Sequence, residues 1–122
     1  MLARMGITRT ALHAHNVFFT LHDGSPAHCQ KLVSDCYEYL QGHDGVVAFL
    51  AGARAEGYTR DVNDQSFHVS LHMVFRDHAT HDAYQVAPRH AVFVERNKPS
   101  WKIVRVFDSE VAPGARTDAG AV

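Results

Sequence analysis

Tyr84 and His90 lie on either side of Pro88, and their types and spacing could support acid–base chemistry. In one unbroken helix, residues six apart point about 120° apart and could not converge. Pro88 cannot continue a helix, so one short helix is expected to end before it and another to begin there. The break would let His90 turn toward the side that Tyr84 faces, where the two could act as base and acid. The alternative interpretation is structural: a half-buried tyrosine and a histidine that fixes a turn.

A strand and a helix start are predicted just before this pair. Apolar and mostly polar residues alternate through residues 67–76, and this period of two predicts a strand with one continuous apolar face. Asp77 follows as a predicted helix N-cap. The next ten residues, which include Tyr84, are expected to form a short helix. The apolar face comprises Phe67, Val69, Leu71, Met73 and Phe75, and the other face comprises His68, Ser70, His72, Val74 and Arg76.

The N-terminal half predicts a strand, a helix and a second strand. Residues 15–21 alternate as a strand. A helix is expected over residues 26–41, because apolar residues recur there at three and four and Gly42 would end it. Residues 45–57 contain the second strand, in which Gly52 suggests a bulge or a close approach of another backbone segment.

A last strand over residues 101–111 completes the predicted order β-α-β-β-α-β, with the second helix split. This order predicts an α+β, ferredoxin-like protomer: one antiparallel four-stranded sheet with its helices on one face. Residues 14–111 are expected to form the domain. Residues 1–13 would be an N-terminal extension, and residues 112–122, rich in Gly, Ala and Pro, a disordered tail.

Apolar residues on the second face of this sheet predict a homodimer. Phe18, Val74, Val104 and Val106 occupy positions that could look away from the helices. A single chain would leave such a patch in water, and exposed apolar patches usually mark a partner. Packing two sheets face to face in a symmetric dimer would bury it.

Length and charge exclude several classes of protein. The chain has 122 residues, which suits one domain, and a formal net charge of −1, which does not favour nucleic acid or an anionic membrane surface. No apolar run approaches the roughly 20 residues needed to span a bilayer. Cys29 and Cys36 would stand about 10 Å apart on one helix, too far for a disulfide. We therefore expect reduced cysteines and a cytoplasmic protein.

The ten histidines raise the question of a metal site. His78 and His81 are spaced for one helix face, whereas His68 and His72 would lie about 13 Å apart along a strand. The Cys and His spacings of structural zinc sites do not occur in the sequence. We expect solvent-facing histidines, no metal and no cofactor.

Several motifs resemble the stress-responsive dimeric α/β-barrel domain family, often called Dabb. They are the strand from His15 to Phe19, the Phe75-Arg76-Asp77 strand end, the core Tyr84-x-x-x-Pro88-x-His90-x-x-Phe93, and Trp101 leading to Phe107-Asp108. The resemblance covers residues 14–111. It implies a ferredoxin-like protomer that pairs with a second copy into a dimeric α/β-barrel.

The sequence also resembles, distantly, one plant branch of this family, the polyketide cyclases that close a ring by acid–base chemistry. By position, the resemblance implies catalytic roles for His90, Tyr84 and His15. Val104 and Val106 could share a pocket wall with Trp101 only if a bulge or an earlier strand start intervened, which leaves open whether these two valines lie on the dimer face. The pocket walls implied by the resemblance are Val17, Phe19, Val33, Tyr37, Leu71, Phe93, Trp101, Val104 and Val106.

Three functional hypotheses follow. The first is a stress-associated protein without assigned activity, able to bind a small apolar ligand between sheet and helices. The second is a cyclase-like enzyme in which His90 removes a proton α to a carbonyl while Tyr84 donates a hydrogen bond to the enolate oxygen. The third is a cofactor-independent monooxygenase. An enzyme would require an open cavity of roughly 300 Å³ or more that both Tyr84 and His90 face.

Overall fold

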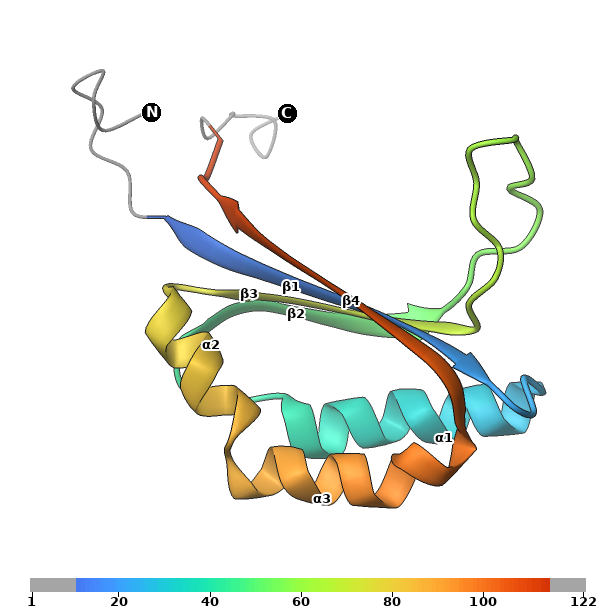
Figure 1. Cartoon of the computed structure of the whole chain (residues 1–122), viewed down its shortest axis with the longest axis horizontal. Coiled ribbons are helices and arrows are strands. Elements are labelled where there is room, and N and C mark those ends of the chain that lie inside the picture. Colours follow the sequence, from blue (N-terminus) through green and yellow to red (C-terminus); the bar gives the residue numbers. More distant parts are fainter. Residues whose placement is uncertain (1–10, 115–122) are drawn as a thin grey trace, which may run out of the picture.

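The computed structural model of this chain describes residues 11–114. Four strands and three α-helices follow one another in the predicted order, and the second helix is split as expected (Figure 1). The elements are β1 Leu12–Leu21, α1 Pro26–Asp35, a π-helical turn Cys36–Leu40, β2 Val46–Ala53, β3 Val69–Phe75, α2 His78–Gln85, α3 Pro88–Asn97, a 3₁₀ turn Lys98–Ser100 and β4 Trp101–Val111.

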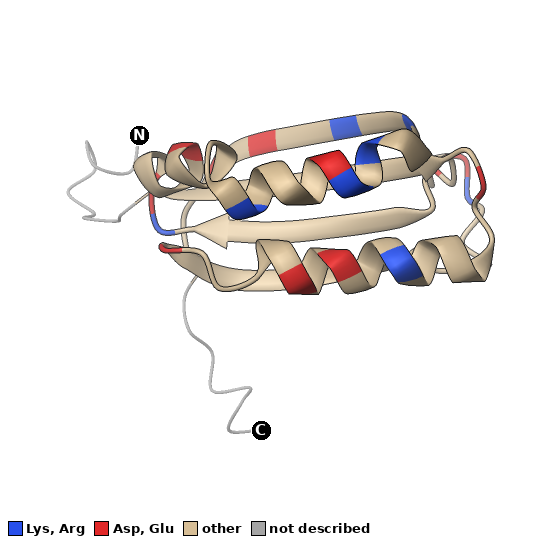
Figure 2. Ribbon diagram, turned by 90° about the horizontal axis from the view of Figure 1, so that it is seen from below, with Lys and Arg blue, Asp and Glu red and all other residues tan. Residues whose placement is uncertain are grey.

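The strands form one antiparallel sheet in the order β2-β3-β1-β4, which is the ferredoxin-like arrangement. All three helices lie on one face of this sheet, and the loop between β2 and β3 rises on the other side (Figure 1). Seen from the helix side, α1 and α3 run side by side and carry charged residues of both signs (Figure 2). The predicted fold class is confirmed.

The core forms where the two central strands meet the helices. In β1 every second residue, from His13 to Leu21, is buried, and in β3 the same is true from Val69 to Phe75. These faces pack against apolar residues of the helices, of which Leu32, Cys36 and Leu40 are almost completely buried. Apolar residues that recur every second position in the strands and every three to four positions in the helix thus pack into one continuous core.

A bulge in β4 sets which of its residues face the helices. Trp101 pairs with Leu21 and Ile103 pairs with Thr20, so Lys102 is an extra residue in the pairing. Val104 and Val106 consequently stand beside residues of the buried face of β1. The bulge is one of the two irregularities that the sequence left open, and it places these two valines on the helix side rather than on the face first considered for a dimer.

Other strand details differ from the sequence prediction. β1 begins at Leu12, three residues earlier than predicted. The irregularity in β2 is at Val47, between Val46 and Ala48, and not at Gly52, which pairs regularly with β3. The predictions for residues 1–10 and 115–122 lie outside the described residues.

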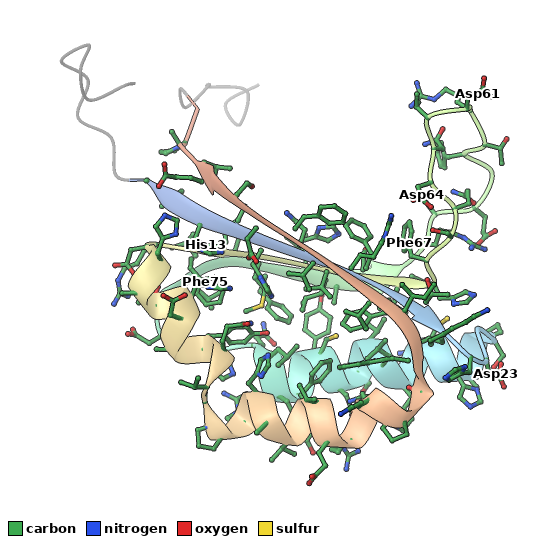
Figure 3. The ribbon with its side chains drawn as sticks, viewed as in Figure 1. His13, Asp23, Asp61, Asp64, Phe67 and Phe75 are labelled. Carbon is green, nitrogen blue, oxygen red and sulfur yellow. The ribbon has the colours of Figure 1, made fainter. Side chains whose placement is uncertain are left out.

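Phe67 lies on the opposite face from the one predicted. The chain bends at His68, just before β3 begins, so the alternation of β3 does not extend back to Phe67. The Phe67 ring lies 5.0 Å from that of Phe18, on the face without helices. Figure 3 shows Phe67 on that face and Phe75 on the helix side.

The break between α2 and α3 forms as the sequence predicts. The Asp77 carboxylate caps α2 by accepting a hydrogen bond from the backbone N–H of Thr80 at 2.8 Å. Ala87 is extended, and Pro88 occupies the first turn of α3. The extended residue before a proline is what steric contact with the proline ring favours.

The turn before β2 packs closely against α2. Gly45 has a positive φ of 86°, a conformation that side chains rarely adopt. A Cβ at Gly45 would collide with the side chain of Thr80, and the Gly45 carbonyl accepts a hydrogen bond from the backbone N–H of Arg76 at 2.8 Å. Glycine therefore fits this position on two counts.

Two further expectations can be checked within residues 11–114. Cys29 and Cys36 are both buried and free, as predicted. Burial raises the pKa of the Cys36 thiol to about 12, so this thiol stays protonated. Among the described helices, none is long and apolar enough to cross a bilayer.

Candidate functional site

A partly open cavity of about 180 Å³ lies between the sheet and helices α2 and α3. Strands β1 and β4 supply one wall, and the break between the two helices supplies the other. Because the proline break turns α3 back along the sheet, residues of α2 and α3 reach the same space (Figure 1). The cavity is lined by His15, Val17, Phe19, Leu40, Leu71, Tyr84, Gln85, His90, Phe93, Val94, Trp101, Val104 and Val106.

Tyr84 and His90 meet in this cavity. Their ring centroids are 4.8 Å apart and the rings are nearly perpendicular, at 80°. Within residues 11–114, neither the Tyr84 hydroxyl nor the His90 ring has a hydrogen-bond partner. The Trp101 indole N–H is also buried in the wall without a partner. Of these three groups only the Trp101 N–H is a buried polar atom without a partner, and buried polar groups are normally paired. Together with the unpaired Tyr84 hydroxyl and His90 ring on the same cavity, it indicates room for a polar ligand atom.

Burial sets the protonation of this pair. Burial raises the pKa of the Tyr84 hydroxyl well above its usual range, so Tyr84 is a neutral hydrogen-bond donor. Burial also lowers the pKa of His90, and the nearby His15, His43 and His81 act in the same direction. A neutral imidazole beside a neutral phenol is suited to removing a proton and stabilising the resulting oxyanion.

His15 forms the far side of the cavity, on β1. Its ring centroid lies 5.9 Å from that of Tyr84, and its Nδ1 is 2.7 Å from an Asp108 carboxylate oxygen. Burial lowers the pKa of His15, although the hydrogen bond to Asp108 opposes this. His15 is thus neutral and held in place by β4.

Ten of the twelve residues predicted for the site line this cavity, and Val33 and Tyr37 do not. Val33 borders a separate hollow between α1 and β2. Tyr37 is 41% exposed, and its hydroxyl lies 3.3 Å from the backbone N–H of Ala51. These two residues therefore lie outside this cavity, because they face β2 rather than β4.

Sequence reasoning missed three lining residues. Leu40 belongs to the predicted apolar helix stripe, and Gln85 and Val94 directly follow the predicted site residues Tyr84 and Phe93. The apolar stripe was a signal for Leu40. The other two depend on how α2 and α3 are turned about their axes, which the sequence does not give.

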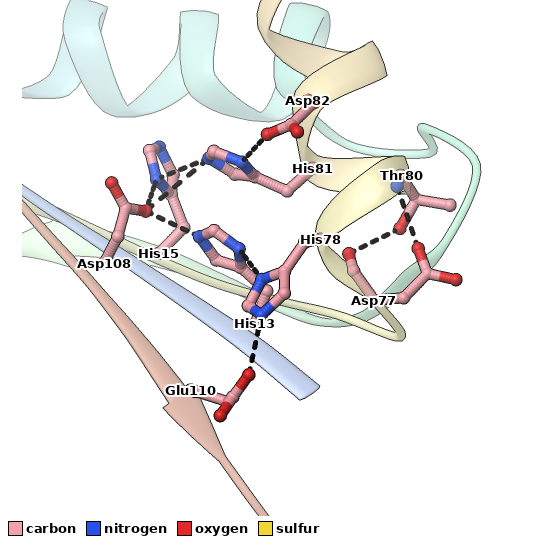
Figure 4. Close-up of polar contacts among 9 residues, drawn as sticks. All are labelled: His13, His15, Asp77, His78, Thr80, His81, Asp82, Asp108 and Glu110. Atoms are coloured by element: carbon pink, nitrogen blue, oxygen red, sulfur yellow. Dashed lines mark hydrogen bonds and ion pairs between the residues drawn. The ribbon is translucent and has the colours of Figure 1, made fainter. Parts of the chain in front are cut away.

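A second cluster adjoins the cavity and was also missed. His13 and His15 from β1, His81 from α2 and Asp108 from β4 each offer one ligand atom, and these atoms all lie within 4.8 Å of one another (Figure 4). The three histidines are buried. The available signal was the His-x-His spacing of β1, because residues two apart in a strand share one face. These four residues are the ones that could hold a metal ion.

Comparisons with known proteins agree with this fold. The family model Dabb, described as the stress responsive A/B barrel domain, matches residues 14–111. A Dabb family protein with a ferredoxin-like fold from Mesorhizobium loti is 26% identical, with a TM-score of 0.67 over 85% of this chain and 99% of that one. Among curated proteins, none matches this sequence.

Two more distant structures share the fold. A hydroxynitrile lyase from Passiflora edulis is 16% identical, with a TM-score of 0.70 over 88% of this chain and 99% of that one. A dimeric ferredoxin-like protein of unknown function from Thermobifida fusca is 12% identical, with a TM-score of 0.70 over 83% of this chain and 92% of that one. At these identities the likeness shows the fold alone.

Proposed function

We propose that this chain, which belongs to the stress-responsive A/B barrel domain (Dabb) family, binds a small, mostly apolar molecule in the cavity between the sheet and α2 and α3. One observation carries the proposal. The Tyr84 hydroxyl, the His90 ring and the Trp101 indole N–H lack hydrogen-bond partners among the described residues, although all three line a mainly apolar cavity. A ligand with a polar atom would supply the missing partner.

The cavity favours a ligand with one hydrogen-bond acceptor. The Tyr84 hydroxyl and the Trp101 N–H are donors, and a neutral His90 ring can donate through one nitrogen. A carbonyl oxygen on a short apolar body suits these groups. The volume of about 180 Å³ is below the roughly 300 Å³ expected for a drug-sized ligand, so the ligand should be small.

Ligand binding can be tested with two tyrosine variants that make the same chemical change. A panel of small aldehydes, ketones and cyclic enones would be screened against the chain by protein-observed NMR. Tyr84→Phe should weaken binding of any hit by about tenfold, since it removes one hydrogen bond of roughly 1 to 1.5 kcal/mol. Tyr37→Phe is the matched control outside the cavity and should leave affinity unchanged. Equal affinity in all three proteins would contradict the proposal.

Proton abstraction α to a carbonyl is a second candidate function, favoured by the geometry of Tyr84 and His90. The cavity of about 180 Å³ is smaller than the roughly 300 Å³ expected for an enzyme, so this candidate ranks below ligand binding. Burial leaves the His90 imidazole neutral and Tyr84 a donor, with ring centroids 4.8 Å apart. In this mechanism, His90 takes the proton and Tyr84 hydrogen-bonds the enolate oxygen. The Passiflora edulis protein supports the idea that this fold can host an active site. The monooxygenase hypothesis gains no specific support from residues 11–114.

Carbon-acid chemistry is tested by exchange of a substrate proton with solvent. A short β-keto thioester in D₂O should exchange its α-proton faster with the wild-type chain than with His90→Ala. The free thioester and Tyr37→Phe serve as controls for background exchange and for an unrelated change. Equal rates with wild type and His90→Ala would remove this candidate while leaving the binding proposal standing.

The sheet face without helices supports a homodimer. The Phe18 ring packs edge-on against Phe67 and Phe107, at 5.0 and 5.8 Å between centroids, and Leu50 and Ile103 on the same face are 58% and 50% exposed. Val74 also lies on this face, as predicted. The Thermobifida fusca protein with this fold is described as dimeric. A second copy of the chain, packed sheet to sheet, would cover these residues.

A further inference from the structure

We propose that His13, His15, His81 and Asp108 form a binding site for one divalent transition-metal ion, with Zn²⁺ as the best fit. Three separate elements bring them together: β1 supplies two histidines, α2 the third and β4 the carboxylate. Three imidazoles and one carboxylate are ligands that zinc commonly takes in proteins. The inference does not depend on what the cavity binds.

The distances among the four groups suit one small ion. Asp108 Oδ1 lies 2.8 Å from His13 Nε2, 2.7 Å from His15 Nδ1 and 3.5 Å from His81 Nε2. His15 Nδ1 and His81 Nε2 are 3.2 Å apart. Ligands of a tetrahedral zinc ion are about 3.3 Å apart, given bonds of about 2.0 to 2.1 Å. Shifts of well under 1 Å would adjust the two shortest pairs. The widest pair, up to 4.8 Å apart, must also close, and the stacked rings of His13 and His81 must tilt from their present 17° for all four atoms to reach one ion.

The hydrogen bonds that link His13 to His78 and Glu110 direct the His13 Nε2 lone pair toward the proposed ion position. The Glu110 carboxylate lies 2.9 Å from His78 Nε2 and accepts a hydrogen bond from the Nε2–H group. A neutral His78 therefore has no proton on Nδ1. That Nδ1 lies 2.8 Å from His13 Nδ1 and must accept a hydrogen bond from it. A neutral His13 is then left with a bare Nε2 directed at the Asp108 oxygen. Two acceptors at 2.8 Å repel each other unless a cation lies between them.

His81 is oriented in the same way. The Asp82 carboxylate lies 3.0 Å from His81 Nδ1 and accepts a hydrogen bond from the Nδ1–H group. The lone pair on Nε2 then faces His15 and Asp108. Carboxylates commonly hold the outer nitrogen of metal-binding histidines in this manner, because they fix the tautomer and strengthen the ligand. Figure 4 shows both chains of hydrogen bonds running outward from the cluster.

The charges around the cluster also favour a cation. Asp108 provides one negative charge within it, and Asp82 and Glu110 provide two more at its edge. The three histidine side chains are at most 9% exposed, while that of Asp108 is 42% exposed, so an ion could enter from the Asp108 side. The competing occupant is a proton, which would make one histidine an imidazolium and satisfy Asp108 without a metal.

Metal content distinguishes the two occupants. The full chain would be dialysed against EDTA, then titrated with Zn²⁺ in competition with a chromophoric chelator. We expect one high-affinity equivalent per chain. His81→Gln and Asp108→Asn should abolish this equivalent, whereas Asp82→Asn should weaken it by about 10- to 100-fold because it alters only ligand orientation. His28→Gln, at an exposed histidine outside the cluster, should bind as the wild type does.

Substitution with Co²⁺ identifies the ligands independently of the variants. Four-coordinate Co²⁺ held by nitrogen and oxygen gives visible absorption without the near-ultraviolet thiolate band that Cys29 or Cys36 would produce. A wild-type chain that takes up less than one tight equivalent of Zn²⁺ would overturn the proposal without any variant. So would a thiolate band, or unchanged affinity in His81→Gln and Asp108→Asn chains whose circular dichroism shows them folded.

Discussion

The Tyr84 side chain is buried and its hydroxyl has no hydrogen bond among the described residues, which makes the role of the hydroxyl in stability testable. Tyr84→Phe should leave the free energy of unfolding within about 0.5 kcal/mol of the wild type, because it removes no internal hydrogen bond. Tyr84→Ala should cost about 3 to 5 kcal/mol, since it empties a buried aromatic position. Urea denaturation measures both. A loss above about 1 kcal/mol in Tyr84→Phe would indicate that the hydroxyl is a structural group.

Buried histidines should make stability depend on pH. Burial lowers the folded-state pKa of His15, His72 and His90 from the ordinary value of 6.5. The unfolded chain therefore binds more protons below pH 6.5, and the free energy of unfolding should fall as the pH falls from about 7 to 5. Each histidine can contribute a slope of at most about 1.4 kcal/mol per pH unit.

Variants assign this slope to particular histidines. In EDTA-treated protein, His90→Asn should flatten the profile between pH 5 and 7, and the same change at the exposed His22 should not. The titration of Asp108 does not contribute to the change in stability between pH 5 and 7. Burial tends to raise the pKa of Asp108, but the adjacent His13 and His15 rings outweigh that and lower it below its ordinary value, so its contribution to stability is lost only at lower pH. A flat wild-type profile would contradict the prediction.

At the residue scale, the sequence predicted groups that are close along the chain and missed those that strand pairing brings together. Tyr84 and His90 could be inferred because the proline between them has a fixed local effect. The metal cluster could not be inferred, because Asp108 meets His15 only through the β1–β4 register. Side-chain pairs across strands are a property of pairing, which single-sequence patterns do not contain.

The Gly45 turn is the element-scale feature with the clearest test. Gly45→Ala should reduce the free energy of unfolding by more than about 1 kcal/mol, from positive-φ strain and collision with Thr80. Gly57→Ala is the matched control: its φ is 88°, but nothing lies within 4 Å of the added Cβ. Chemical denaturation should show the larger loss at Gly45. Equal losses would mean that backbone strain alone matters and that the contact with Thr80 adjusts freely.

The limits of elements that have local sequence signals were predicted well. The face on which each residue of an element lies was predicted less well. Asp77 and Pro88 marked the limits of α2 and the start of α3, since capping and proline geometry act within one turn. The face of Phe67 and the position of the irregularity in β2 were misjudged, because a bend or a bulge changes which side a residue takes without altering the apolar pattern.

At the scale of the whole molecule, the face without helices predicts the assembly state. Phe107→Glu places a charge on that face beside Phe18 and should convert a dimer into a monomer in light scattering coupled to size-exclusion chromatography. Val62→Glu is the control, because Val62 is 80% exposed in the loop between β2 and β3. A monomeric wild type, or a dimer that survives Phe107→Glu, would contradict a dimer through this face.

The extra residue in β4 has a consequence for the evolution of this chain. Lys102 keeps both Trp101 and Val104 on the cavity side, which a regular alternation would not allow. Loss of the Lys102 codon alone would place Trp101 two positions before Val104, so both would stay on the cavity side in a regular strand. Loss of a residue between Val104 and Asp108 would instead send the side chains on one side of it to the opposite face. The cavity wall, the histidine cluster and the apolar outer face therefore depend on the length of β4 after the bulge, whereas the bulge itself can lose its extra residue.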